Sequence, residues 1–360
     1  MDATNEAGVS RFRRRSGPLG VNGRPVGNRA DKGAYRSCDL YGALDLGTNN
    51  CRLLIATPVD GGFTVVDAFS RIVRLGEWQS RTGRLHDQAM TRTVDALRVC
   101  ANKLKWRSVT KTRLVATEAC RTALNGTEFI ARVTSETGLI LEIIDRETEA
   151  VLAATGAEPL IDPQAETALV FDIGGGSTEV MWMARNGGRF EIAAWTSLAV
   201  GVVTISELFG GGADVTPASF AAMRAFLHPM IMEFANRVAQ ITGRPSVPTH
   251  LLGTSGTVTT IAGVQLGLAR YDRSKVDGCW LNSADTGRVA SDLLAMSYDE
   301  RAANPCIGRE RADLVLAGCA ILEEIRLAFP AERIRVADRG LREGILTMLM
   351  KQDGTYGRHA

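Results

Sequence analysis

Ala43-Leu44-Asp45-Leu46-Gly47-Thr48 is the stretch that decides the fold, because it returns as Val170-Phe171-Asp172-Ile173-Gly174-Gly175. Each copy reads apolar, apolar, Asp, apolar, Gly, small. The apolar run predicts a buried strand. The glycine after it predicts a tight turn into a hairpin, because Gly adopts backbone angles that a side chain forbids. An internal repeat of this kind predicts two similarly folded domains that face each other.

Both copies lie in an alternation of short β-branched runs and helical periodicities, which indicates an α/β protein. Pro159 and Pro163 mark a junction, because proline blocks a continuing helix. We expect domains at 39–160 and 161–352, and a flexible end at 353–360. The expected strands are 40–45, 51–57, 63–73, 111–117, 139–145, 167–173, 178–184, 190–196, 250–253 and one beginning at 334. The expected helices are 90–104, 128–137, 147–157, 217–238, 283–296, 311–329 and one ending at 350.

The charges of the chain are unevenly distributed. The formal net charge is +2, yet residues 1–38 carry eight basic side chains against three acidic ones, which is +5 and leaves −3 for the remainder. That segment also has six Gly, two Pro and no apolar periodicity, so it cannot offset the entropy of ordering it. We expect a disordered basic tail, either dispensable or an electrostatic tether for a polyanion such as RNA.

Composition excludes several classes of protein. Hydrophobic residues make up 45% of the chain, enough for sizeable cores, but no run has the 18 or more apolar residues of a membrane span. The arginines near the start precede no apolar segment of the kind an export signal needs. The seven Cys form no C-x-x-C pair or disulfide framework, which favours a reducing cytoplasm.

Three glycine-rich turns carry the chemistry. Gly47-Thr48-Asn49-Asn50 and Gly174-Gly175-Gly176-Ser177 follow the repeated strands, and Gly253-Thr254-Ser255-Gly256-Thr257 stands between a strand and a helix. Successive backbone N–H groups in such turns form concavities that bind phosphate oxygens. A plain hairpin or a structural helix cap is the alternative for any single turn. Matched copies in two domains favour phosphate binding, with Gly253, Ser255 and Gly256 as the third contact.

These turns, with two motifs between them, resemble the exopolyphosphatase/guanosine pentaphosphate phosphatase family of the actin, sugar-kinase and Hsp70 superfamily. Ala116-Thr117-Glu118-Ala119-Cys120-Arg121-Thr122-Ala123-Leu124-Asn125 is similar to its arginine motif, and Ile144-Asp145-Arg146-Glu147-Thr148-Glu149-Ala150 stands where its catalytic glutamate helix begins. Ala337-Asp338-Arg339-Gly340-Leu341-Arg342-Glu343-Gly344 is similar to its last motif. The similarity extends over about residues 39–350.

The resemblance implies two ribonuclease H-like domains around an interdomain cleft, with the phosphate loops on opposite walls. It implies Glu149 as general base. The alternative for Glu149 is a glutamate at a helix start that interacts only with the helix dipole. It implies Arg121 as a fixed positive charge on phosphate, against the alternative of a surface salt bridge. It also implies Mg²⁺, an ion that prefers oxygen ligands. The carboxylates best placed to contact Mg²⁺ are Asp172, Glu179 and Asp45.

The sequence departs from the family pattern in three places. Asn50 replaces the usual Ser, and Asp145-Arg146 replaces small residues before the glutamate helix. The chain ends soon after Gly344, so we expect a short form without the C-terminal HD-like domains and a preference for short substrates. The chain has four His, and His86-Asp87 is its one adjacent His-Asp pair; with the other three His far apart in the sequence, we expect no metal-dependent HD site.

The expected reaction is release of terminal phosphate from inorganic polyphosphate, and cleavage of guanosine pentaphosphate is the close alternative. A small-molecule kinase of the same fold would need a fuller adenosine site than Gly253–Thr257, and a non-catalytic nucleotide-binding protein would not need Glu149. We expect no membrane partner and no specific nucleic acid, apart from weak contact of the tail with RNA or polyphosphate. Exposed helices could pair two copies in a homodimer.

Overall fold

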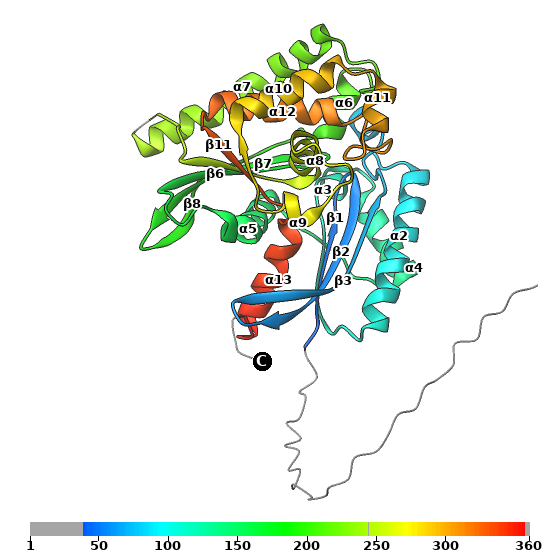
Figure 1. The fold of residues 1–360 in the computed structure, drawn as a ribbon. Coiled ribbons are helices and arrows are strands. Elements are labelled where there is room, and N and C mark those ends of the chain that lie inside the picture. Colours follow the sequence, from blue (N-terminus) through cyan, green and yellow to red (C-terminus); the bar gives the residue numbers. More distant parts are fainter. Residues whose placement is uncertain (1–38, 244, 357–360) are drawn as a thin grey trace, which may run out of the picture. The chain divides into compact units, whose positions relative to one another are not determined.

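The computed structural model describes residues 39–243 and 245–356. The basic tail expected over residues 1–38 lies outside the described residues, as do residues 357–360. The described residues form one compact unit, built from two α/β lobes that each carry one mixed sheet (Figure 1). Among the described helices, none is both long and apolar enough to cross a membrane.

The first lobe contains a five-stranded sheet in the order β3-β2-β1-β4-β5. Its first three strands run antiparallel through two hairpins, and β4 and β5 then add in parallel. The strands are β1 (Tyr41–Leu46), β2 (Asn50–Val59), β3 (Gly62–Ile72), β4 (Lys111–Ala116) and β5 (Glu142–Ile143). The helices are α1 (Gln79–Thr82), α2 (Asp87–Trp106), α3 (Glu118–Thr122), α4 (Gly126–Thr137) and α5 (Arg146–Ala157), followed by the 3-10 turn η1 (Glu158–Leu160).

The second lobe repeats this topology. Its sheet has the order β10-β11-β9-β6-β7-β8, in which β8-β7-β6 is the antiparallel meander and β9 and β11 are parallel additions. The strands are β6 (Thr167–Ile173), β7 (Thr178–Asn186), β8 (Arg189–Leu198), β9 (His250–Thr254), β10 (Trp280–Asn282) and β11 (Arg333–Val336). The helices are α6 (Val202–Leu208), α7 (Pro217–Thr242), α8 (Ser255–Gln265), α9 (Arg273–Val276), α10 (Ser283–Ala295), α11 (Tyr298–Ala303), α12 (Val315–Ala328) and α13 (Leu341–Gln352). The duplicated α/β fold expected from the repeat is confirmed.

Helices α5 and α13 lie between the two sheets (Figure 1). Apolar residues of α13 pack with β1 and β2 of the first sheet, while the alanines of α5 pack on β6 and β7 of the second. The two helices cross at glycines: a Cβ on Gly156 would lie 1.9 Å from the carbonyl oxygen of Gly340, and one on Gly344 would lie 1.9 Å from that of Leu152. This contact requires Gly at both positions.

The packing of α13 departs from the expected domain limits. Residues 161–352 were expected to form one domain, yet α13 leaves the second lobe and contributes Leu341, Ile345 and Met350 to a core with Tyr41. Residues 353–356, expected to belong to a flexible end, continue this contact, since the Asp353 carboxylate accepts a hydrogen bond from the Tyr41 hydroxyl at 2.9 Å. The C-terminal segment therefore returns to the first lobe because its apolar face matches that sheet.

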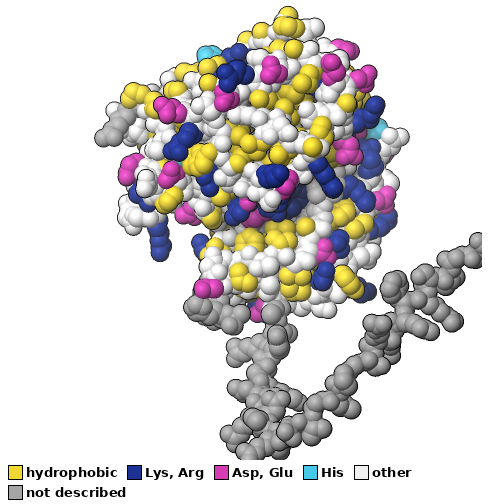
Figure 2. All heavy atoms as spheres, viewed as in Figure 1, with side chains coloured by type: hydrophobic (Ala, Val, Ile, Leu, Met, Phe, Trp, Pro, Cys, Tyr) yellow, Lys and Arg dark blue, Asp and Glu magenta, His cyan; other side chains and the backbone are white. Residues whose placement is uncertain are grey.

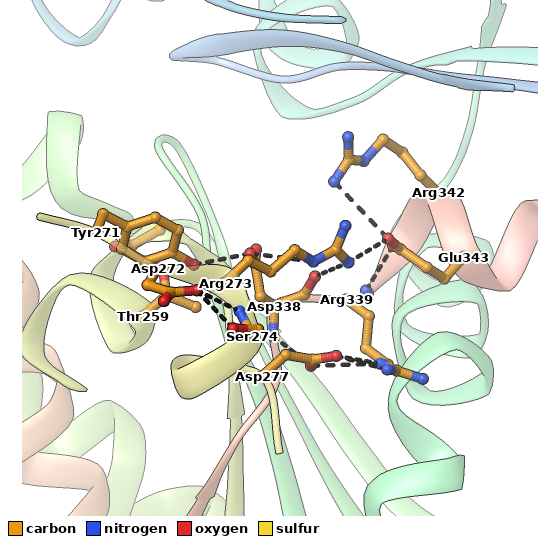
Figure 3. A network of polar contacts seen from close by, with 12 residues as sticks. Thr259, Tyr271, Asp272, Arg273, Ser274, Asp277, Asp338, Arg339, Arg342 and Glu343 are labelled. Atoms are coloured by element: carbon orange, nitrogen blue, oxygen red, sulfur yellow. Dashed lines mark hydrogen bonds and ion pairs between the residues drawn. The ribbon is translucent and has the colours of Figure 1, made fainter. Parts of the chain in front are cut away.

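A polar network anchors the start of α13 to the second lobe (Figure 3). The Tyr271 hydroxyl donates to Asp338 at 2.7 Å, and the Arg273 guanidinium donates to the Asp338 carbonyl at 2.6 Å. Arg339 pairs with Asp277. The α9 region thus holds the turn before α13 on the second lobe. Because α13 itself packs on the first lobe, it links the two lobes.

Candidate active site

A cleft lies where the two repeated hairpin turns face each other. It is also lined by the first turn of α8 and by one side chain of α5. Most residues expected to bind phosphate or metal or to act as base line it together: Asp45, Gly47, Thr48, Asn49, Asn50, Glu149, Asp172, Gly174, Gly175, Gly176, Ser177, Glu179, Ser255 and Gly256. Two expected residues, Gly253 and Arg121, do not line it.

The two phosphate loops have the same local geometry and touch each other. The Gly47 N–H donates to the Asn50 carbonyl at 2.9 Å, and the Gly174 N–H donates to the Ser177 carbonyl at 3.0 Å. A Cβ on Gly176 would come within 2.5 Å of the Thr48 hydroxyl oxygen. The second loop therefore needs glycine for the close approach of the opposite loop.

Several polar atoms in the cleft have no protein partner. Among the described residues, the buried Thr48 Oγ1, Asn49 Oδ1 and Ser255 Oγ accept and donate no hydrogen bond. Ser255 also has φ 90°, a strained backbone conformation for a residue with a side chain. Neither Thr254 nor Ser255 forms the side-chain cap that a purely structural helix start would show. Orphaned buried polar atoms of this kind are suited to a ligand with many oxygens.

Gly253 has a packing role. It lies inside β9, and a Cβ there would be 2.7 Å from the ring of Phe171. Its place in the glycine-rich motif reflects contact between neighbouring strands of the sheet, whereas Ser255 and Gly256 reach the cleft.

Acidic side chains form a row on the floor of the cleft. Asp172 and Glu179 are direct partners in β6 and β7, and Ser197 of β8 donates to Glu179 at 2.8 Å. Burial raises the pKa of Asp172 to about 6. Burial, with repulsion from Glu149 and Asp172, raises the pKa of Glu179 well above its usual value. The pKa of Asp45 is also raised, mainly by burial.

Glu149 enters the cleft from the first turn of α5. Asp145 caps this helix by accepting from the Thr148 N–H at 2.7 Å, which fixes the direction in which Glu149 leaves it. Glu149 as a whole is 8% exposed, and burial raises the pKa of its carboxyl to about 7 even though Arg121 opposes the shift. Glu147 points elsewhere and is exposed. A carboxylate with this pKa can accept a proton near neutral pH.

Arg121 stands behind Glu149. Its Nη1 donates to Glu149 Oε2 at 3.0 Å and to the Ile144 carbonyl at 2.7 Å, and its Nη2 pairs with Glu118. Glu118 in turn accepts from Arg146 at 2.8 Å, so the Asp145-Arg146 departure noted above supplies an ion pair. Arg121 thus orients the carboxylate of Glu149 through Nη1, while its buried Nε has no hydrogen-bond partner and the residue does not line the cleft.

The cations that do face the cleft are Arg52 and Arg311. A Cβ on Gly256 would lie 3.7 Å from Arg52 Nη2 and 3.9 Å from Arg311 Cζ, so both guanidiniums flank the start of α8. Neither forms an ion pair within the described part of the chain, and Arg311 donates to Thr260 at 3.1 Å. Burial and repulsion from Arg52 lower the pKa of Arg311.

Sequence reasoning missed both arginines as ligand-facing groups. The alignment of the two repeats held a signal for Arg52, because it pairs with Asp45 across the hairpin where the second copy pairs Glu179 with Asp172. Arg311 lies in a turn before α12, which begins only at Val315, and no local pattern marks it.

The carboxylates fit a divalent cation that arrives with its ligand. Among the described residues, no three His, Cys, Asp or Glu side chains are grouped as a metal site. Mg²⁺ commonly takes one or two protein carboxylates and completes its shell with phosphate oxygens and water. Asp172 and Glu179 are buried neighbours on paired strands, and their carboxylate oxygens have the donor chemistry for this.

Comparison with known proteins identifies the family. Residues 54–353 match the model of the Ppx/GppA phosphatase family. The chain belongs to the Ppx/GppA phosphatase family.

Two curated members of the Ppx/GppA family illustrate the similarity. The chain is 29% identical over 320 residues to Exopolyphosphatase 2 of Mycobacterium tuberculosis, a match that covers 85% of this chain and 97% of that protein. It is 28% identical over 309 residues to a putative exopolyphosphatase of Haemophilus influenzae, covering 86% and 91%.

Solved Ppx/GppA structures share the fold. A family member from Aquifex aeolicus superposes with a TM-score of 0.72 at 27% identity, covering 88% of this chain and 99% of its own. An exopolyphosphatase from Cytophaga hutchinsonii gives a TM-score of 0.78 at 25% identity, covering 88% and 98%. The two-lobed, actin-like α/β architecture is therefore that of the family. Membership of this family identifies the chain as a phosphatase.

Proposed function

We propose that this protein releases terminal orthophosphate from inorganic polyphosphate. The observation that supports this most is the position of Glu149: a buried carboxylate with a pKa of about 7 projects into the same cleft as two phosphate loops. The resemblance of the chain to proteins named exopolyphosphatases agrees with this reaction.

Binding would use neutral donors and two cations. The backbone N–H groups of the two phosphate loops and the unpartnered Thr48 and Ser255 hydroxyls would take phosphate oxygens. Arg52 and Arg311 would offset their charge, a role suited to a planar guanidinium. The surface contributes little, because Figure 2 shows Lys/Arg and Asp/Glu side chains interspersed on the face viewed. The local site, and no broad basic band on that face, would select the substrate.

In the chemical step, Glu149 would take a proton from water as the water oxygen attacks the terminal phosphorus. The phosphoanhydride P–O bond breaks, and the shortened chain leaves with the bonding electron pair. Arg121 would hold the Glu149 carboxylate toward the cleft through its 3.0 Å hydrogen bond. Holding base and substrate in line is the main source of rate in such reactions.

Five acidic side chains line the cleft, against the two guanidiniums, so a bare polyanion would be repelled. This imbalance supports substrate bound as its Mg²⁺ complex. Asp172, Glu179 and Asp45 would hold the ion, which when bound neutralises phosphate charge and polarises a phosphoryl oxygen.

The lining favours polyphosphate over a nucleotide. None of the residues lining the cleft is aromatic, and its few apolar members are scattered: Ile173, Val202, Leu314, Val315 and Leu341. A guanine or adenine base is usually held by stacking or in an apolar pocket. A kinase or nucleotide sensor would need such a stacking surface or apolar pocket for the base. Polyphosphate has no base and does not need one.

The test is orthophosphate release from polyphosphates of defined length, guanosine pentaphosphate and ATP, each with Mg²⁺ and with the Glu149→Gln protein as control. We expect the highest kcat/KM on polyphosphate. Faster cleavage of guanosine pentaphosphate would assign the other activity of the family, and ATP-dependent phosphorylation of an acceptor would assign a kinase.

A further inference from the structure

Polar contacts join the two lobes next to residues that line the cleft. Arg74, just after β3, donates two hydrogen bonds to the Asp313 carboxylate at 2.9 and 3.1 Å and one to the Glu310 carbonyl at 3.1 Å. Nearby, the Trp78 N–H and the Ser80 hydroxyl of the first lobe donate to Glu207 of α6 in the second lobe. These contacts are called the rim bridge below.

On the first-lobe side, the rim bridge is continuous with the first phosphate loop. The N–H groups of Val73 and Arg74 both donate to the Asn49 carbonyl, at 2.8 and 3.0 Å, and the Gly76 N–H donates to the Thr48 carbonyl at 2.9 Å. A Cβ on Gly76 would lie 2.2 Å from the Thr48 side chain. A displacement of Arg74 therefore displaces the Thr48-Asn49 loop.

On the second-lobe side, the rim bridge is continuous with the other two binding elements. The N–H groups at the start of α6 donate to the Gly174 and Gly175 carbonyls at 3.0 and 2.8 Å, so Glu207 is on a helix tied to the second phosphate loop. Asp313 is two residues after the cleft cation Arg311 and its carbonyl accepts from Ser206 of α6 at 3.1 Å.

Two residues of the rim bridge region also have a rarely populated backbone conformation. Arg74 has φ 48° and Trp78 has φ 64°, both in the left-handed region that non-glycine residues seldom adopt. Such strain persists where surrounding contacts hold it. The Arg74–Asp313 pair is only partly exposed, with side-chain exposures of 36% and 19%.

We propose that Arg74, Asp313 and Glu207 are positioning residues that assemble the phosphate site from its three parts. The rim bridge ties together the first loop, the second loop and the Arg311 turn, so formation of the bridge and phosphate binding are coupled. The proposal rests on the proposed function for the identity of the ligand, but not for the coupling.

The first experiment measures binding of Mg²⁺-tripolyphosphate by calorimetry, using the full chain with Glu149→Gln so that turnover does not interfere. Arg74→Asn removes the charge while keeping a residue that tolerates positive φ, and Glu207→Ala removes the second contact independently. We expect each to weaken binding about tenfold, within the usual range of coupling between sites. Combining Arg74→Asp with Asp313→Arg reverses the pair and should recover most of the affinity.

Arg98→Gln is the matched control, because Arg98 pairs with Asp95 and Glu136 within the first lobe, away from the rim. In the otherwise wild-type chain, the rim variants should raise KM for tripolyphosphate about tenfold and change kcat much less, since Glu149 and Arg121 are outside the bridge. Single variants that bind as tightly as the parent, or lose no more than Arg98→Gln, would overturn the proposal.

Failure of the proposed function would look different. A wild-type protein that binds tripolyphosphate but releases no orthophosphate would remove the proposed reaction and leave the coupling measurable, because the binding assay needs no turnover. A charge-reversed pair that folds with an unchanged melting temperature and still binds as weakly as Arg74→Asn would overturn the role of the pair.

Discussion

At the scale of single residues, Glu149 is the group on which the chemistry depends. It is buried, lines the cleft and accepts a hydrogen bond from one guanidinium, that of Arg121, whereas the neighbouring Glu118 pairs with both Arg121 and Arg146. Replacing it by Gln keeps the hydrogen bond but removes the base. We expect Glu149→Gln to lower kcat by roughly 10²-fold or more while binding of tripolyphosphate is retained. Near-normal phosphate release by this variant would contradict the assignment.

Arg121 has a different predicted signature. It lowers the pKa of Glu149 against the effect of burial, so its removal should raise that pKa further. For Arg121→Gln we expect the acid limb of the pH profile of kcat/KM to move to higher pH, with KM changed only slightly. Arg52→Gln, which faces the cleft, should instead raise KM. If both variants raised KM alike, Arg121 would contact phosphate directly, as the family resemblance implied.

How far the sequence predicts the site depends on how local the signal is. The sequence predicted that the phosphate loops and Glu149 would meet in one cleft, because a turn or a helix start positions each residue by itself. It did not predict the contacts of Arg121, because these depend on Glu118 and Arg146 reaching it from separate elements. Arg311 was missed since only lobe packing brings it to the cleft.

At the scale of elements, the crossing of α5 and α13 sets the distance between the sheets. Gly344 allows the backbones to touch, and a Cβ there would meet the Leu152 carbonyl oxygen at 1.9 Å. We expect Gly344→Ala to destabilise the fold by about 3 kcal/mol, because backbone atoms must move apart. Urea unfolding measures this. Gly62→Ala is the control, since a Cβ at Gly62 meets nothing within 4 Å, and equal stability of the two variants would show that the crossing is not tight.

The elements themselves were largely predictable where periodicity and turn residues agree. Strand β6 has the limits expected from sequence, Thr167 and Ile173. The strand expected at 139–145 shrinks to Glu142–Ile143, because only that pair reaches β4 at the sheet edge. The helix expected from 311 begins at Val315. The preceding turn is held by the buried Arg301, which donates to the Ala312 and Ala213 carbonyls. Arg301 and these two carbonyl groups are separated along the chain, so no local sequence pattern predicts the contacts that hold the turn.

At the scale of the whole molecule, closing two lobes on one another buries acids that water would otherwise solvate. Glu149, Asp172 and Glu179 come from both lobes, and each has a raised pKa with burial as the largest cause. The proposed phosphate complex would offset this free-energy cost of burying the acids when it binds. A site built for a ligand is thus less stable when empty.

This arrangement predicts how stability changes with pH. A carboxyl whose pKa is raised on folding binds its proton more tightly in the folded state, so its contribution to stability is lost as pH rises through the folded pKa. For Glu149 the window runs from the ordinary glutamate pKa of 4.5 to about 7, and for Asp172 from the ordinary aspartate pKa of 3.8 to about 6. We therefore expect the free energy of unfolding, measured by urea titration without Mg²⁺ or phosphate, to fall by about 2 kcal/mol between pH 5.5 and pH 8.5.

Two variants separate the buried site from the rest of the surface. Glu149→Gln cannot ionise, so it should flatten this decrease and be the more stable protein at pH 8.5. The exposed neighbour Glu147 is on the same helix turn but points away from Glu149, so Glu147→Gln should follow the wild-type curve. If stability instead rose with pH, or if both variants behaved alike, the acids of the cleft would not be the groups that oppose closure, and the strain would have to reside elsewhere between the lobes.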